Sequence, residues 1–176
     1  MIRTDRLLLR QWREADRAPW RAMNADPEVM RHFPSVLSVE EADRLMDRCR
    51  DLLAEQDSLG FWAVERLADG AFLGFVGLNR IGHDIPLKGE WEVGWRLARH
   101  GWGQGYASEA ARASLAHGFG AMGLARIVAY TASSNEPSLA VMRRIGMRPA
   151  AQEDFDHPLL PDGHALKRHV VWEARR

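Results

Sequence analysis

This sequence of 176 residues has a single cysteine, no net charge and no long apolar run. Its single cysteine, Cys49, excludes an intramolecular disulfide and a metal site built from cysteine ligands. Basic and acidic residues number 24 each, and this zero net charge gives no reason to expect nucleic acid or an anionic membrane as a partner. No apolar run is long enough to span a bilayer and no signal peptide is recognised, so we expect a cytoplasmic protein.

Repeats, low-complexity tracts and linkers rich in proline or serine are also missing, so we place no domain boundary and expect one domain over residues 1–176. Hydrophobic residues make up 46% of the chain, which is enough to build one core. The seven histidines show no paired spacing on one helix face, and no metal site is predicted.

The most informative stretch of the chain is 91–118, which contains three glycines at alternate positions: Gly101, Gly103 and Gly105. Residues 91–97 are rich in aromatic and β-branched residues and predict a strand, and small residues then recur at helical spacing. A strand, a glycine-rich turn and a helix N-terminus form a cradle for phosphate, because free backbone N–H groups and the helix dipole point at the anion. No Lys-Ser or Lys-Thr pair follows, which excludes a nucleoside triphosphate P-loop.

The rest of the chain mixes strand and helix patterns. Strands are predicted over residues 6–12, 61–66, 72–78, 91–97, 126–131, 147–154 and 165–173, and helices over 14–24, from 38, from 107 and from 133. Ser38 and Glu41 fit a capping box, and Cys49 lies in the apolar stripe of the helix that they open. We therefore expect Cys49 to be a buried structural thiol and not a nucleophile.

These motifs together resemble the GCN5-related N-acetyltransferase (GNAT) superfamily. The resemblance rests on the order of elements, on the segment 92–97 running into 101–110, and on 135–138 before 144–147. Residues 3–10 and 169–172 resemble in particular the branch that includes ribosomal-protein N-terminal acetyltransferases. The resemblance implies an α+β (α/β) domain of three α-β-α layers, with a mixed, splayed sheet of about seven strands and about four flanking helices.

The resemblance also implies that acetyl-CoA is the co-substrate. The family's phosphate motif falls on residues 100–105, where His100 replaces the usual Gln or Arg and the neighbouring Arg99 could substitute for it. The pantetheine arm is expected along the backbone of residues 95–97, in the gap where that strand splays from the next. The expected cofactor contacts are Trp95, Leu97, His100, Gly101, Trp102, Gly103, Gln104, Gly105, Tyr106, Ala107, Asn135 and Ser138.

Acyl transfer to an amine needs a base for the amine proton, a donor to the carbonyl oxygen and an acid for the leaving thiolate. We predict Glu92 as the base, because it begins the strand aimed at the thioester, with Glu90 second on the same face. Three further polar residues follow as candidates: Asp154, Asp156 and His157. The resemblance implies that Ser138 protonates the thiolate. Purely structural roles stay open for Glu92 in surface pairing, for Ser138 at a helix start and for Asn135 in a turn.

The acceptor is expected to be a protein N-terminus or a small amine, acetylated directly in a ternary complex without an acyl-enzyme. His32, Phe33 and Trp91 are predicted to line the acceptor cleft, with packing alone as an open alternative. The Gly-x-Gly-x-Gly spacing and the lack of an acidic residue ending the strand 126–131 disfavour a dinucleotide oxidoreductase. A non-catalytic CoA-binding module is the alternative function, and exposed edge strands make a homodimer an option.

Overall fold

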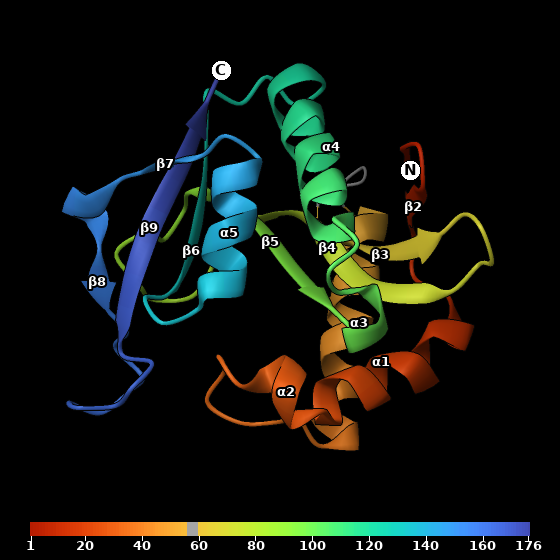
Figure 1. Ribbon diagram of the computed structural model, residues 1–176, viewed down its shortest axis with the longest axis horizontal. Coiled ribbons are helices and arrows are strands. Elements are labelled where there is room, and N and C mark those ends of the chain that lie inside the picture. Colours follow the sequence, from red (N-terminus) through yellow and green to blue (C-terminus); the bar gives the residue numbers. More distant parts are fainter. Residues whose placement is uncertain (56–59) are drawn as a thin grey trace.

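The computed structural model describes residues 1–55 and 60–176 (Figure 1). Its centre is one mixed sheet in the order β1-β2-β3-β4-β5-β6-β9-β7, with β8 paired to β9. The strands are β1 (Ile2–Arg3), β2 (Leu7–Arg10), β3 (Gly60–Arg66), β4 (Phe72–Arg80), β5 (Trp91–Leu97), β6 (Arg126–Ala132), β7 (Arg148–Pro149), β8 (Phe155–Asp156) and β9 (Arg168–Arg175). The helices are α1 (Arg17–Ala25), α2 (Pro27–Met30), α3 (Val39–Glu55), α4 (Tyr106–Gly120) and α5 (Glu136–Arg144).

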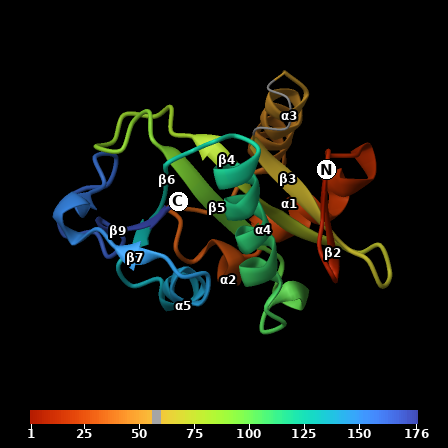
Figure 2. The same cartoon turned by 90° about the horizontal axis from the view of Figure 1, so that it is seen from above.

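The sheet lies between two layers of helices, as predicted. Figures 1 and 2 show α4 and α5 on one face and α1 and α3 on the other, with α2 beside α1. On the first face, Gly118 of α4 approaches so closely that an added Cβ would lie 2.8 Å from the Cδ1 atom of Leu78. On the second face, the ring of Trp20 in α1 packs 5.9 Å from that of Phe75 in β4. Because strand side chains alternate, these two contacts assign residues 75–80 of β4, and the β5 residues that pair with them, to a face.

The helix α3 confirms two local predictions. Ser38 N–H donates to Glu41 Oε2 (2.8 Å) and Glu41 N–H donates to Ser38 Oγ (3.2 Å), which completes the predicted capping box. The Cys49 side chain is buried in the main hydrophobic cluster, as its position in the apolar stripe predicts. Among the residues that the structure describes, no helix has both the length and the apolar character needed to cross a membrane.

The counts of strands and helices need correction. The described residues form nine strands and five α-helices, where about seven and about four are predicted. The helix α2 begins directly after the predicted helix over 14–24, at a position where no further helix is predicted. The Asp26 side chain accepts the N–H of Glu28, and Pro27 lies in the first turn, so this pair also starts a new helix.

The predicted strand over 147–154 is too long. Only residues 148–149 pair with β9, and a 3₁₀ turn at 151–153 follows. Pro149 lacks an N–H group and cannot continue a ladder of hydrogen bonds. The next strand, β8 at residues 155–156, lies between the predicted strands 147–154 and 165–173, and it pairs with the start of β9.

The strands β5 and β6 diverge, which positions the candidate site. β5 pairs with β4 along its whole length, whereas its parallel pairing with β6 is confined to Glu92 and Val128. From Val93 onward, the edge of β5 that faces β6 has no ladder with it, and Figure 1 shows the carboxyl ends of the two strands apart. This confirms the predicted splay, and it leaves backbone groups of β5 free to bind another molecule.

Candidate active site

The glycine loop between β5 and α4 presents a series of free donors. Gly103 (φ 72°) and Gly105 (φ 77°) adopt the left-handed conformation that residues with a Cβ rarely adopt. Gly105 is the N-cap of α4 and provides no capping side chain. Within the described part of the chain, the N–H groups of residues 103–108 donate no hydrogen bond. These donors lie at the positive end of the α4 dipole, an arrangement that suits an anion such as a phosphate.

Arg6, from the segment before β2, holds this loop. Its Nη1 donates to the carbonyl oxygen of Gln104 (2.9 Å), and its Nη2 lies 2.6 Å from the carboxylate of Glu109 in the first turn of α4. Its guanidinium carbon is 4.7 Å from the centre of the Tyr106 ring. The Thr4 hydroxyl also donates to Glu109 (2.6 Å). This anchor could not be predicted from the sequence, because no local pattern links residues about a hundred positions apart.

The side chains predicted to assist the loop are engaged elsewhere. The Nε2 atom of His100 is 3.0 Å from the carbonyl oxygen of Phe72, and the indole N–H of Trp102 donates to the carbonyl oxygen of Leu97 (2.7 Å). Arg99, the substitute for His100, is exposed and 4.0 Å from the carboxylate of Asp26. The strongest anion ligands of this loop are therefore its backbone N–H groups.

The start of α5 lies at the end of β6, across the splay from β5. Asn135 is the N-cap of α5, and its Oδ1 accepts the N–H of Ser138 (3.3 Å). Its Nδ2 donates to the hydroxyl of Thr131 (2.8 Å). The Ser138 side chain is half-buried, and its hydroxyl makes no hydrogen bond with the described residues. Asn135 therefore holds the start of the helix, while the Ser138 hydroxyl is available to another molecule.

Glu92 lies on the sheet face that α1 and α3 cover, next to several polar groups that the sequence analysis missed. Asn79 Nδ2 donates to its Oε1 (3.1 Å). Burial raises the pKa of Glu92, while hydrogen bonds from Asn79 and Tyr130 act in the opposite direction. The Tyr130 hydroxyl is 3.1 Å from Nε2 of the exposed His83, so polar groups connect this carboxylate to the surface. A carboxylate with a raised pKa suits a general base.

The other predicted carboxylates have basic partners. Glu90 lies 3.5 Å from Arg126, which also pairs with two further carboxylates. Asp154 and Asp156 lie 3.8 and 3.4 Å from Arg168. Among the described residues, no Lys, Arg or His forms an ion pair with Glu92. Glu92 thus differs from the alternatives in having neutral neighbours.

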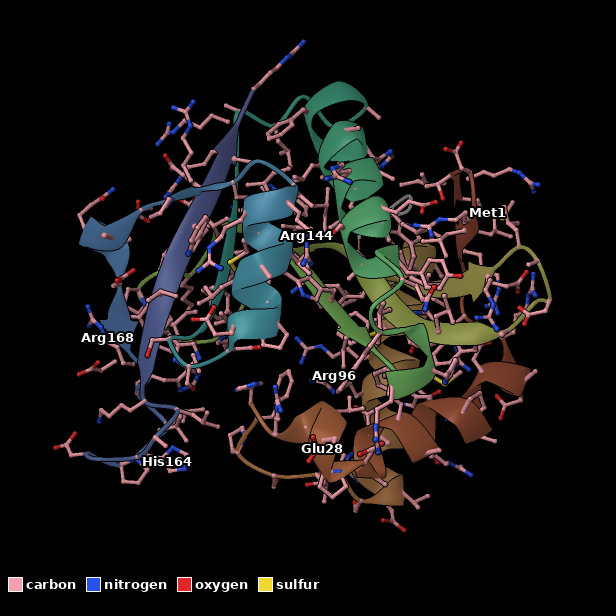
Figure 3. All side chains as sticks on the ribbon, viewed as in Figure 1. Met1, Glu28, Arg96, Arg144, His164 and Arg168 are labelled. Atoms are coloured by element: carbon pink, nitrogen blue, oxygen red, sulfur yellow. The ribbon has the colours of Figure 1, made fainter. Side chains whose placement is uncertain are left out.

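The residues predicted to line an acceptor cleft divide between the two faces of the sheet. Phe33 reaches the face of Glu92, where its ring centre lies 4.0 Å from the guanidinium carbon of Arg96. Figure 3 shows Arg96 between β5 and α2. Trp91 lies on the opposite face by strand alternation, packed against the main core, and so does Trp95. The structure therefore brings Phe33, and not Trp91, to the side of Glu92.

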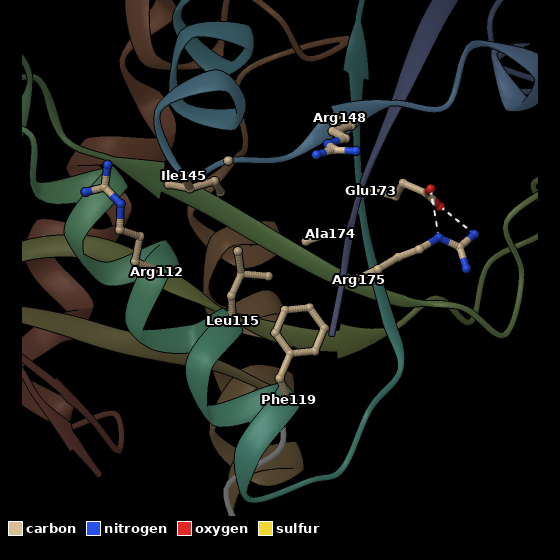
Figure 4. Close-up of a pocket in the computed structure, with 9 residues that line it drawn as sticks. Arg112, Leu115, Phe119, Ile145, Arg148, Glu173, Ala174 and Arg175 are labelled. Carbon is tan, nitrogen blue, oxygen red and sulfur yellow. Dashed lines mark hydrogen bonds and ion pairs between the residues drawn. The ribbon is translucent and has the colours of Figure 1, made fainter.

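A cavity of about 530 Å³ opens between α4, α5 and β9 (Figure 4). It is lined by Arg112, Leu115, Phe119, Ile145, Gly146, Arg148, Glu173, Ala174 and Arg175. None of the predicted site residues is among them. Over residues 1–55 and 60–176, no group of three or more His, Cys, Asp or Glu side chains is arranged to hold a metal ion.

A splayed mixed sheet with an anion-binding loop at the splay defines a class of proteins, and comparisons with known proteins identify it. A family model described as an acetyltransferase (GNAT) domain matches residues 6–148. The uncharacterized N-acetyltransferase YnaD of Bacillus subtilis is 34% identical over 171 residues, which cover 93% of this chain and 89% of YnaD. The chain belongs to the GNAT family and is an N-acetyltransferase.

Solved structures agree with this assignment. A GNAT-family acetyltransferase from Bacillus anthracis matches with a TM-score of 0.80 and 26% identity over 99% of this chain and 97% of that one. A spermidine N-acetyltransferase from Vibrio cholerae, solved with CoA and spermine, has a TM-score of 0.74 at 16% identity over 98% and 96% of the two chains. At that identity the second similarity concerns the fold alone.

Proposed function

We propose that this protein transfers an acetyl group from acetyl-CoA directly to a primary amine, either a protein N-terminus or a small amine. The observation that carries this proposal is the set of N–H groups at 103–108, which have no partner in the described chain and lie at the start of α4. Gly103 has no protein atom within 4 Å of the place where a Cβ would lie, so a pyrophosphate fits against its backbone. The membership of the chain in a family that uses acetyl-CoA supports the same conclusion.

The geometry suggests which step of the reaction the residues on each face of the sheet would assist. Acetyl-CoA supplies the activated acetyl group as a thioester. The free edge of β5 from Val93 onward offers backbone groups to the pantetheine arm and N–H donors to the carbonyl oxygen. Glu92, on the α1 and α3 side, would accept the amine proton, and Ser138, on α5, would donate a proton to the leaving thiolate.

Direct transfer also predicts that the single cysteine is dispensable. Cys49 belongs to α3, and burial raises the pKa of its thiol to about 11, so it is not a nucleophile at neutral pH. We expect Cys49→Ala to keep kcat and to lose about 1 kcal/mol of unfolding free energy from the small cavity that it creates. Intact-protein mass spectrometry after mixing with acetyl-CoA checks this. A covalent acetyl adduct on the wild type that is absent from the variant would contradict it.

Calorimetric titration of the purified protein with acetyl-CoA, with NAD as the control, tests the proposed function. We expect binding of acetyl-CoA in the micromolar range and no heat with NAD. Release of free thiol that requires an added amine then separates an enzyme from a non-catalytic CoA-binding module. A folded protein that does not bind acetyl-CoA would overturn the proposal.

A further inference from the structure

Arg96 is a largely enclosed cation without a negatively charged partner. Its Nε is buried and has no hydrogen-bond partner, and its Nη1 donates to the side-chain oxygen of Asn24. The rings of Phe33 and Phe75 lie 4.0 and 5.6 Å from its guanidinium carbon. Among the described residues, no carboxylate forms an ion pair with it. Burial lowers the pKa of Arg96 to about 10, so the group is still charged at neutral pH. Arg96 as a whole is half-buried, but a cation whose Nε is shielded from solvent is costly unless something pairs with it.

His32 provides a second buried donor without an acceptor. Its Nε2 lies 3.0 Å from the Nε–H of Arg31, which donates to it, so we assign the ring proton to Nδ1. That Nδ1 atom is buried and has no partner. Burial and the charge of Arg31 lower the pKa of His32, which keeps the ring neutral. His32 directly precedes Phe33, whose ring centre lies 4.0 Å from the guanidinium carbon of Arg96, so the backbone places His32 one residue from that contact.

The free edge of the guanidinium has the geometry that a carboxylate requires. Asn24 occupies only Nη1, which leaves the Nε and Nη2 donors side by side on one edge. Two parallel N–H groups of this kind bind both oxygens of a carboxylate. Glu92 is on the same face of β5, about 13 Å away between Cα atoms. The ring of Phe61 lies over Gly94 between them, 2.9 Å from the position of an added Cβ.

We propose that Arg96, assisted by His32, binds a carboxylate of the acceptor, and that the protein acetylates amines that carry a carboxylate group. This inference rests on the proposed function and narrows its acceptor to amino-acid-like molecules. Alkylamines and polyamines, which carry no carboxylate, would leave the two buried donors unpaired, which penalises their binding. The carboxylate could belong to a free amino acid or to an acidic residue next to a peptide N-terminus.

Matched pairs of acceptors test the proposal directly. L-amino acids are compared with their amides, and C-terminally amidated dipeptides with Asp in second place are compared with the amidated dipeptides that have Asn there. Rates are expressed per neutral amine, because amidation lowers the pKa of the amino group. In each pair we expect kcat/KM to be about tenfold or more higher for the acceptor that carries the additional carboxylate. This ratio corresponds to an ion pair worth about 1.4 kcal/mol or more. The amino-acid and dipeptide pairs distinguish the two sources. Equal rates within every pair, or no acetylation of any acid, would overturn the proposal.

Three variants test whether the preference for carboxylate-bearing acceptors depends on Arg96. Arg96→Gln should raise KM for the acids, leave the amides unchanged and leave acetyl-CoA affinity unchanged. Asn24→Asp should also raise KM for the acids only, because the new carboxylate would neutralise the guanidinium while Arg96 is kept. This variant replaces Arg96→Gln as the test if Arg96→Gln does not fold. Arg80→Gln, at the exposed end of β4, removes one charge as a control and should change nothing. Equal losses for acids and amides would make Arg96 structural and overturn the proposal. Loss of acetyl-CoA binding by the wild type would instead defeat the proposed function.

Discussion

Replacing Gly103 with valine is expected to raise the Kd for acetyl-CoA about a hundredfold, while the same change at Gly70 leaves it unaltered. The two glycines are matched, because Gly103 (φ 72°) and Gly70 (φ 71°) have the same left-handed backbone. Neither has a protein atom within 4 Å of an added Cβ. They differ in place, since Gly103 belongs to the loop before α4 and Gly70 to the turn between β3 and β4.

Comparing the Gly103→Val and Gly70→Val variants distinguishes the effect of backbone strain from the loss of the anion-binding site. Both variants should lose a similar free energy of unfolding, about 1–2 kcal/mol, because a side chain is strained in this conformation. Only at Gly103 would the added methyl groups lie where the backbone must approach the phosphates. Denaturant unfolding measures the first quantity and calorimetric titration the second. A folded Gly103→Val protein with unchanged acetyl-CoA affinity would show that the loop does not bind the cofactor.

The parts of the structure that follow from local pattern are predictable from the sequence. The strand predicted over 91–97 is β5 to the residue, and the glycines at 103 and 105 have the positive φ angles that a turn into a helix requires. Ser38 and Glu41 cap α3 as their spacing predicts. In each case the interacting groups lie within a few positions of one another, so the sequence order itself contains the information.

The polar groups around the site are not predictable in this way. Arg6 and Glu109 are 103 positions apart, Arg96 and Asn24 are 72 apart, and both pairs depend on how distant elements pack. No periodicity reports such a pairing. The placement of Trp91 is different, because adjacent residues of a strand face opposite sides. The alternation was already visible in the sequence, and applying it separates Trp91 from Glu92.

Glu92→Gln is expected to lower kcat about a hundredfold or more near neutral pH, because it removes the group that accepts the amine proton. Burial raises the pKa of Glu92, so the carboxylate is in its active, charged form above that pKa. The wild type should therefore lose activity as the pH falls through it, in addition to the loss caused by protonation of the amine. The variant should lose activity at low pH only through protonation of the amine. Steady-state rates across the pH range measure both profiles.

The matched control is Glu90→Gln, because Glu90 lies on the same face of the sheet and is bound to Arg126. It should leave the pH profile of kcat unchanged. Stability gives an independent check on Glu92. A carboxylate whose pKa is raised by folding favours the folded state below its unfolded pKa, and this contribution disappears as the pH rises through the folded pKa. At neutral pH Glu92→Gln should therefore keep or gain stability while losing activity, which excludes unfolding as the cause. An unchanged pH profile in that variant would assign the proton transfer to Glu90 or to water.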